Sequence, residues 1–282
     1  MNPNLPLPLP LRLLRDAAAV ITVGCFLFPL VWWGLTSLKP AHAIFELNTT
    51  NWFDFRPTFA NYRVTLAAEG PALFASRQAI LDSVIVATGS AALCLLAALP
   101  AAYALANFSF RAHRVMVLWV LFQRILPPIA VLVPMVLIFH HAVLRDTRTG
   151  VILAHAAANL PFAVLLLKSF FADVPREVAE AATLDGATPL GRLLWIDLPL
   201  IRGGIATTAV LCFILSWTEF LMALFLTGAN VRLMPIQLSL VVTTTWGFTA
   251  ALSMASLLPA LVFILLVQRH LVRGLTMGLG QG

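Results

Sequence analysis

The longest charged segment of this chain runs from Lys168 to Arg202, and residues 173–199 within it read DVPREVAEAATLDGATPLGRLLWIDLP. The start of this stretch, Asp173-Val174-Pro175, favours a helix, because an acidic cap and a proline in the first turn suit the unbonded backbone groups there. Gly186 favours a helix end, since glycine readily adopts the left-handed conformation. Thr188-Pro189 then favours a second start. The stretch therefore predicts two short helices joined by a tight turn.

The rest of the chain is strongly apolar. Of its 282 residues, 60% are hydrophobic and only 11% are charged, whereas an ordinary soluble domain carries roughly 25% charged residues. The formal net charge of +6 is scattered over loops and forms no basic face for nucleic acid. A soluble globule, a disordered chain and a nucleic-acid-binding domain are thereby excluded. The composition indicates an integral membrane protein.

Six apolar runs approach the ~20 residues that a helix needs to cross ~30 Å of hydrocarbon. The third is interrupted by Pro127, Pro128 and Pro134, and the proline-rich first ten residues are expected to remain non-helical. The expected spans are Ala17–Leu35, Ile80–Ala106, Val115–Phe139, Val151–Leu167, Ile205–Leu226 and Ala250–Val267.

These runs predict an all-α membrane protein with six transmembrane helices. We expect an N-terminal arm at 1–16, a transmembrane domain at 17–270 and a C-terminal tail at 271–282. Six spans place both termini on one side. That side holds ten lysines and arginines against seven on the other, so the positive-inside rule predicts cytoplasmic termini and a cytoplasmic charged stretch.

A spaced motif runs through the charged stretch. Glu180-Ala181-Ala182, then Gly186, then Ile196 and Leu198-Pro199 fit the pattern EAA-x3-G-x9-I-x-L-P. This resembles the EAA loop of binding-protein-dependent ABC importer permeases. Further stretches are similar to the carbohydrate branch, the subfamily of the smaller membrane subunit of the maltose transporter. They are LPAAYAL at 99–105, LPP at 126–128, SWTEF at 216–220 and GLTMG at 274–278.

The resemblance implies the type I ABC importer permease fold in a bacterial inner membrane. The EAA loop, at about 171–200, would form a coupling helix that seats in a cleft on an ATPase subunit. The partners implied are a second homologous permease, two cytoplasmic ATPase subunits and a periplasmic solute-binding protein, and the solute would be a carbohydrate or a related polar molecule. The coupling residues would be Glu180, Ala181, Ala182, Leu184, Asp185, Gly186, Ile196, Leu198 and Pro199.

The chain lacks the sequence signature of an ATPase. Its two lysines, Lys39 and Lys168, do not follow glycine, so no GxxxxGK[ST] phosphate-binding loop is present. No arrangement of acids, bases or metal ligands predicts a catalytic or metal site. We therefore expect a non-catalytic subunit that binds no cofactor, with ATP and Mg²⁺ held by partner chains.

Three polar residues within spans are candidates for the translocation path: Arg124, Thr218 and Glu219. An unpaired charge inside the membrane costs about 2.5–3.5 kcal/mol on insertion scales. Arg124 and Glu219 could line the path, pair with each other across spans three and five, or hold helices together. In the alternative function, an ion-gradient-driven secondary transporter or channel, they would couple the ion. Asp82 and His155 are expected at the membrane interface.

Overall fold

The computed structural model describes residues 9–44, 55–66, 76–241 and 246–277, with side chains through residue 266. Every regular element in these ranges is a helix. The chain divides into two compact units. The first comprises residues 1–75 and 240–255, and the second comprises residues 76–239 and 256–282.

The first unit contains α1 (Leu9–Leu38), α2 (Ala41–Ile44) and α3 (Ala60–Leu66). Asn61 at the start of α3 fastens this helix to the end of α1. Its side-chain amide donates hydrogen bonds to the carbonyls of Ser37 and Lys39 at 2.9 and 3.0 Å. The Ser37 hydroxyl also lies 2.8 Å from the Tyr62 hydroxyl. These buried polar contacts stabilise the junction that follows α1.

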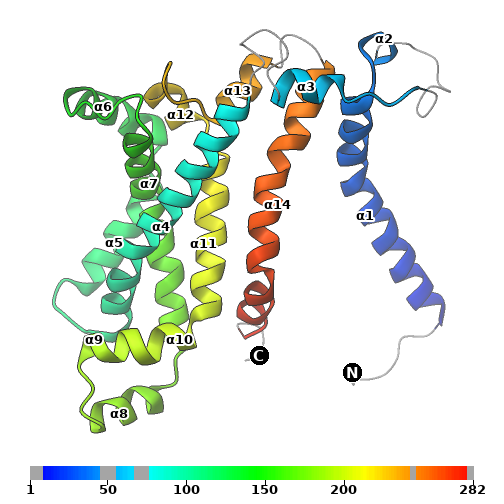
Figure 1. The fold of residues 1–282 in the computed structure, drawn as a ribbon. Helices are drawn as coiled ribbons and strands as arrows, with labels where there is room; N and C mark the ends of the chain where they lie inside the picture. Colours follow the sequence, from blue (N-terminus) through cyan, green and yellow to red (C-terminus); the bar gives the residue numbers. More distant parts are fainter. Residues whose placement is uncertain (1–8, 45–54, 67–75, 242–245, 278–282) are drawn as a thin grey trace. The chain divides into compact units, whose positions relative to one another are not determined.

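The second unit is built around three packed helices, α4 (Arg77–Asn107), α7 (Arg148–Ala172) and α11 (Arg202–Trp217). Small side chains fill much of the surface of α4 that faces its neighbours, including the buried Ala87, Ala91 and Ala98. Small residues let helices approach closely where lipid supplies no hydrophobic drive for association. We call this group the α4–α7–α11 bundle (Figure 1).

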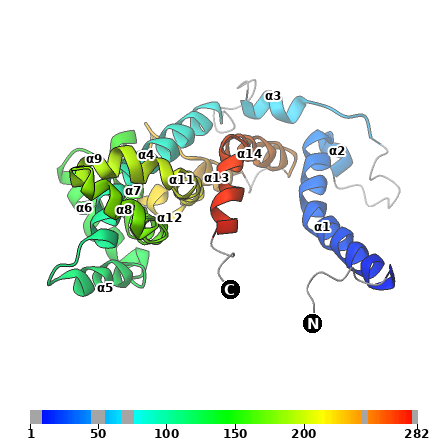
Figure 2. The ribbon, with the colours of Figure 1, turned by 90° about the horizontal axis from the view of Figure 1, so that it is seen from below.

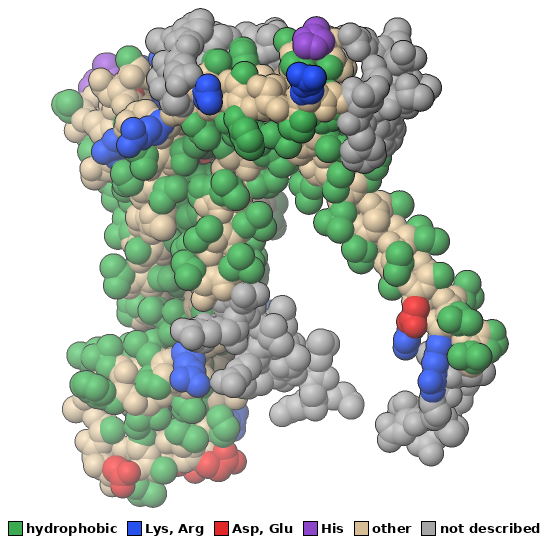
Figure 3. Space-filling model, turned by 45° about the vertical axis from the view of Figure 1, so that its right-hand side comes forward, with side chains coloured by type: hydrophobic (Ala, Val, Ile, Leu, Met, Phe, Trp, Pro, Cys, Tyr) green, Lys and Arg blue, Asp and Glu red, His purple; other side chains and the backbone are tan. Residues whose placement is uncertain are grey.

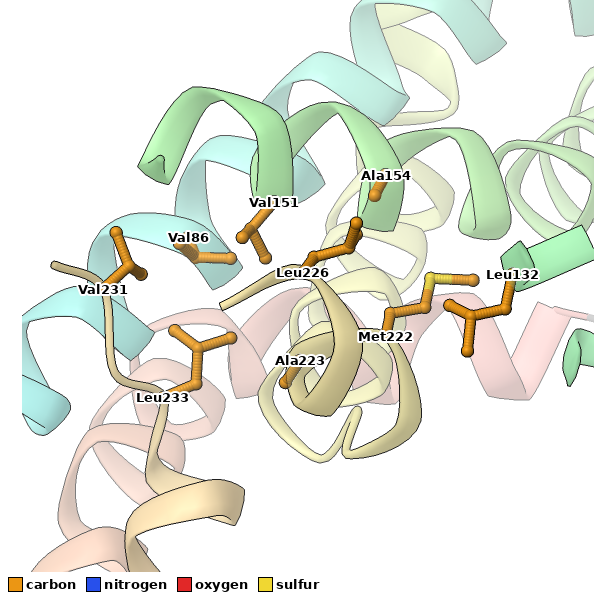
Figure 4. Packing of buried hydrophobic residues seen from close by; sticks show 9 residues of the cluster. All are labelled: Val86, Leu132, Val151, Ala154, Met222, Ala223, Leu226, Val231 and Leu233. Carbon is orange, nitrogen blue, oxygen red and sulfur yellow. The ribbon is translucent and has the colours of Figure 1, made fainter. Parts of the chain in front are cut away.

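The remaining helices pack around the bundle or connect its members. A cluster of buried residues joins α6 and α12 to α4 and α7, with Leu132 and Met222 side by side (Figure 4). The bounds are α5 His113–Gln123, α6 Pro128–His141, α8 Arg176–Leu184, α9 Pro189–Arg192, a π-helical turn Leu193–Asp197, α10 Leu198–Leu200, α12 Leu221–Leu226, α13 Met234–Val241 and α14 Trp246–Met277.

Four described helices are long and apolar enough to cross a membrane by themselves: α1, α4, α7 and the Trp246–Leu266 part of α14. Two bent pairs bring the number to six, α5 with α6 at 92° and Pro189–Leu200 with α11 at 79°. In Figure 3, hydrophobic side chains cover much of the visible surface between the two ends of the bundle. Length and composition thus agree with the six predicted spans.

Several predicted boundaries need correction. The first helix begins at Leu9, with Pro10 in its first turn, where the missing amide of proline leaves no hydrogen bond unmade. The prolines at 127 and 128 break the third span into two helices. The fifth span begins at Arg202 and ends at Trp217. Helix α14 continues to Met277, into the segment that we expected to be a tail.

Asp82, which the sequence predicts at the membrane interface, is fully buried within the protein at 0% exposure. Its Oδ1 accepts hydrogen bonds from Arg148 Nε at 2.8 Å and Gln78 Nε2 at 3.0 Å, and Arg148 Nη2 lies 2.7 Å away. Its Oδ2 accepts from the backbone N–H of Arg232 at 3.2 Å. One carboxylate therefore ties α4 to α7 and to the loop at 227–233.

Asp146, in the turn before α7, holds the same loop. Its carboxylate oxygens accept hydrogen bonds from the backbone N–H groups of Asn230 and Val231, both at 3.0 Å. Burial raises the pKa of Asp146, but hydrogen bonds from Asn230, Val231, Gly228 and Ala229 outweigh it and hold that pKa below its ordinary value. We call the end of the bundle that holds Asp82 and Asp146 the far end. The opposite end, where residues 173–200 lie, is called the segment end.

Candidate functional site

Helix α8 carries the EAA motif on a largely exposed surface. It has nine residues, begins after Pro175 and ends at Leu184. Pro175 is the N-cap, and Asp173 instead caps the end of α7, so the expected acidic cap of α8 is wrong. The preceding proline fixes the direction in which the chain leaves α7. In Figure 1, α8 lies farther from the bundle than α9 and α10.

The turn after α8 has the geometry predicted from Gly186. Its φ is +78°, a region that is strained for residues with a side chain. The N–H of Gly186 donates to the carbonyl of Thr183 at 3.1 Å, and the N–H of Ala187 donates to the carbonyl of Ala182 at 3.0 Å. These two bonds form a Schellman motif, which satisfies the last carbonyls of the helix. The turn between the two helices is therefore sharply defined.

The second helical part begins at Thr188, as the sequence predicted. The Thr188 hydroxyl accepts a hydrogen bond from the N–H of Gly191 at 3.1 Å, and Pro189 occupies the first turn. Viewed from the segment end, α8 and α9 lie over the ends of the bundle helices (Figure 2). The segment thus forms a layer across the bundle end.

Helix α9 is bonded directly to the last turn of α4. The Tyr103 hydroxyl donates to the carbonyl of Pro189 at 3.2 Å, and Arg192 Nη2 donates to Asn107 Oδ1 at 2.9 Å. The Arg192 guanidinium also lies 5.9 Å from the centre of the Tyr103 ring, within the range of a cation–π contact. Phe171, at the end of α7, packs edge-on against the same ring at 5.5 Å. Tyr103 therefore joins α4, α7 and α9.

The predicted coupling residues do not all face the same way. Leu184 is 89% exposed, whereas Ala182 is 4% exposed and packs within the chain itself. Ala182 therefore offers little surface to a partner. Of the other predicted residues, two are half-buried, Ile196 and Leu198. The rest are exposed: Glu180, Ala181, Asp185, Gly186 and Pro199.

The three candidate path residues all lie where a helix is broken. Arg124 is the C-cap of α5 and lies over the Phe162 ring at 5.4 Å. Thr218 caps α11, and Glu219 Oε1 accepts a hydrogen bond from the N–H of Met222 at 3.0 Å. No ion pair joins Arg124 and Glu219, both of which the structure describes, so the proposed pairing across spans three and five is wrong.

A buried polar contact was missed in the sequence. His155, which the sequence predicts at the membrane interface, is 1% exposed, and its Nδ1 lies 2.8 Å from Ser216 Oγ. Ser216 Oγ in turn accepts a hydrogen bond from Ser90 Oγ at 2.8 Å. This contact links α7, α11 and α4 through hydroxyl and imidazole groups. Ser216 belongs to the SWTEF stretch, and that was the available signal for its role.

Comparison with known proteins places this architecture in a family. The family described as "Binding-protein-dependent transport system inner membrane component" matches residues 95–276, more than half of the chain. The chain belongs to this family. It is a permease subunit of an ABC importer and a multi-pass inner membrane protein, which agrees with the resemblance carried by the EAA motif.

Individual relatives cover nearly the whole chain. It is 32% identical to the sulfoquinovosyl glycerol transport system permease protein SmoH of Agrobacterium fabrum, over 94% of this chain and 92% of that protein. It is 30% identical to the trehalose transport system permease protein SugB of Mycobacterium tuberculosis, over 93% and 95%.

A solved structure shares the fold. It is a bacterial ABC transporter involved in the import of the acidic polysaccharide alginate, with a TM-score of 0.73 and 21% sequence identity. The match covers 93% of this chain and 96% of that chain. The likeness shows the type I importer permease fold.

Proposed function

We propose that the chain forms half of the translocation pathway for a carbohydrate or a related polar solute. SmoH, SugB and the diacetylchitobiose uptake system permease protein DasC of Streptomyces coelicolor all carry names of sugar transport systems. A second homologous permease would supply the other half of the pathway. A periplasmic solute-binding protein would deliver the solute.

The observation that carries the coupling role is the bonding of α9 to the end of α4. Helix α8 is exposed and follows α7 directly, while α9 is held to α4 through Tyr103, Asn107 and Arg192. A displacement of α8 by a docked ATPase subunit would therefore move α4 and α7 together. Glu180, Ala181 and Leu184 are the exposed positions on α8 that would meet this subunit.

Energy for transport would come from other chains. Neither Lys39 nor Lys168 follows glycine, so the chain has no loop of the kind that cradles ATP phosphates. Two ATPase subunits would hold ATP and Mg²⁺, and one of them would bind α8 of this chain from the cytoplasm. The same orientation would place both termini in the cytoplasm.

The helix breaks at Arg124 and at Thr218-Glu219 support a place for these residues beside the solute. Irregular backbone at membrane depth is tolerated where it is buried in protein or lines a water-filled cavity. The exposed Arg124 and Thr218 could then contact polar groups of the solute. Glu219 would act more indirectly, because its carboxylate caps α12.

Replacing Ala181 with tryptophan tests the coupling role. Ala181 is exposed, so the added bulk is expected to leave the fold intact but to block docking on α8. We expect ATP-dependent uptake to fall at least tenfold, a loss of about 1.4 kcal/mol or more of interaction, and ATPase subunits to be lost on purification. Ala112→Trp is the matched control, since Ala112 is exposed before α5, outside the segment.

Two results would contradict the proposal. Normal uptake by Ala181→Trp would show that the exposed face of α8 carries no coupling. Uptake by the isolated chain in liposomes, driven by an ion gradient without ATP, would favour the secondary transporter or channel instead. The solute itself is tested by measuring uptake of labelled sugars by the complex reconstituted with its binding protein.

A further inference from the structure

The helical stretch from Pro189 to Leu200 has an unusual distribution of side chains. Its outward surface is entirely apolar, and Trp195 on it is 82% exposed. Its charged residues face inward: Asp197 is 0% exposed, and Arg192 Nε lies 3.1 Å from Asp197 Oδ2. The exposed positions of the stretch are Pro189, Leu190, Leu194, Trp195, Pro199 and Leu200.

The π-helical turn at Leu193–Asp197 produces this arrangement. The N–H of Leu198 donates to the carbonyl of Leu193, five residues earlier. In an α-helix of 3.6 residues per turn, Arg192 and Asp197 would lie on different faces. The wider π turn brings them onto the same inner face, so the charges pair inside while Trp195 points outward.

Two polar anchors fix the depth of this stretch relative to the bilayer. The ion pair of Asp82 with Arg148 lies near the start of α4, and the bond of Asn107 with Arg192 lies at its end. The 25 residues from Asp82 to Asn107 extend about 37 Å along the helix. This length exceeds the ~30 Å hydrocarbon core but fits within the ~40–45 Å of a bilayer with its headgroups. Both anchors therefore lie at headgroup level.

Helix α8 differs in both position and chemistry. It lies farther from the bundle (Figure 1) and exposes charged side chains, Arg176, Glu177 and Glu180. The 189–200 stretch lies against the bundle and exposes none. Tryptophan is enriched at membrane interfaces because its ring is apolar and its N–H is polar. Arg202, exposed just after the stretch, adds a cation that suits a phosphate headgroup.

We propose that the outward surface of residues 189–200 binds the lipid bilayer at headgroup depth, with Trp195 as its main anchor. The lipid surface supports the second half of the EAA segment while α8 projects into water. The inference goes beyond the transport function and holds whichever partner α8 meets.

Quenching of a fluorescent label tests the lipid contact. A Trp195→Cys variant is labelled in a Cys25→Ser background, since Cys94 and Cys212 are buried. The complex, as purified from the membrane, is placed in vesicles of phosphatidylcholine and phosphatidylglycerol. An Ala112→Cys variant is the matched control, because Ala112 is exposed in the loop before α5, outside the surface that a docked ATPase subunit would cover. A Leu190→Cys variant provides a second site on the proposed lipid-facing surface.

Labels at 195 and 190 are expected to be quenched by headgroup-nitroxide lipids at least about threefold more strongly than the label at 112, with the order reversed for iodide. Iodide quenching at 195 equal to that at 112 would place the surface in water and overturn the proposal. Protection of 195 from both quenchers would mean that protein covers it, and would overturn the proposal equally. Neither result depends on transport, so the coupling role is judged separately.

Discussion

The two ends of the α4–α7–α11 bundle are held by different physical means. At the far end, the carboxylates of Asp82 and Asp146 accept hydrogen bonds from an arginine and from backbone N–H groups of the 227–233 loop. At the segment end, close packing stands beside polar bonds: Gly204 of α11 lies against the ring of Phe170, while Arg192 contacts Asn107 and Asp197. The far end thus depends mainly on charge, whereas the segment end combines close packing with the polar contacts of Arg192.

This difference suits the two ends to different tasks. Bonds from a carboxylate to several donors fix a loop in one place, because each lost bond exposes an unpaired buried group. Packed rings and small residues can shift together as one body, since few directional bonds are broken. We therefore expect the far end to be the more rigid, and the following predictions test each end in turn.

The largest effect is expected from Asp82→Ala. This substitution leaves Arg148 and the Arg232 N–H without their acceptor. It should lower the free energy of unfolding by about 3 kcal/mol. That value is at the lower end of the range for broken buried ion pairs, because Arg148 is half exposed. Thermal unfolding in detergent measures the change. Asp16→Ala is the control, since the pair of Asp16 with Arg15 is exposed and should contribute little. Equal stability of both variants would refute the dependence of the far end on charge.

A smaller loss is expected from Gly204→Ala at the segment end. A Cβ on residue 204 would overlap the Phe170 ring, so α7 and α11 must separate or the ring must turn. Overpacking of this kind costs about 1–3 kcal/mol. The control is Gly24→Ala, where nothing lies within 4 Å of the added atom. An unchanged unfolding temperature for Gly204→Ala would show that packing there is loose.

The smallest effect concerns Asp146 and depends on pH. Its folded pKa is held below the ordinary value, so its ionised form stabilises the fold above the unfolded pKa of about 3.9. That stabilisation is lost as pH falls through the folded pKa. Proteolysis of the 227–233 loop should therefore increase on acidification. In Asp146→Asn, this loop should already be cleaved faster at neutral pH, and acid should increase its cleavage less than in the wild type. The same dependence of cleavage on pH in both proteins would show that Asp146 does not hold the loop.

Much of the EAA segment could be predicted because its signals are local. Gly186 predicts a helix end because glycine readily adopts the left-handed conformation, and Thr188-Pro189 predicts a helix start because threonine can cap it. The six apolar runs likewise predicted the number of spans, since crossing a bilayer sets their length. The family resemblance rested on the same local residues. The places where a helix ends inside an apolar run, such as the end of α11 at Trp217, were harder to predict, because the apolar composition continues beyond them.

Other features depended on partners distant in the sequence. Asp82 and His155 looked interfacial because each lies near the end of an apolar run. Their burial follows from Arg148 and Arg232 in one case and from Ser216 in the other. The residues next to Asp82 and His155 in the sequence do not indicate these partners.

The amino-acid order alone determined that this chain enters a bilayer and carries a two-helix EAA segment, and it predicted six spans, because hydropathy, proline and glycine act within a few residues. Only the folded arrangement decided which charges are buried and which surfaces remain open. Ala182 turned inward, Trp195 turned outward, and Arg192 met both Asn107 and Asp197. Those outcomes come from helix packing and from one π turn, which act over the whole bundle.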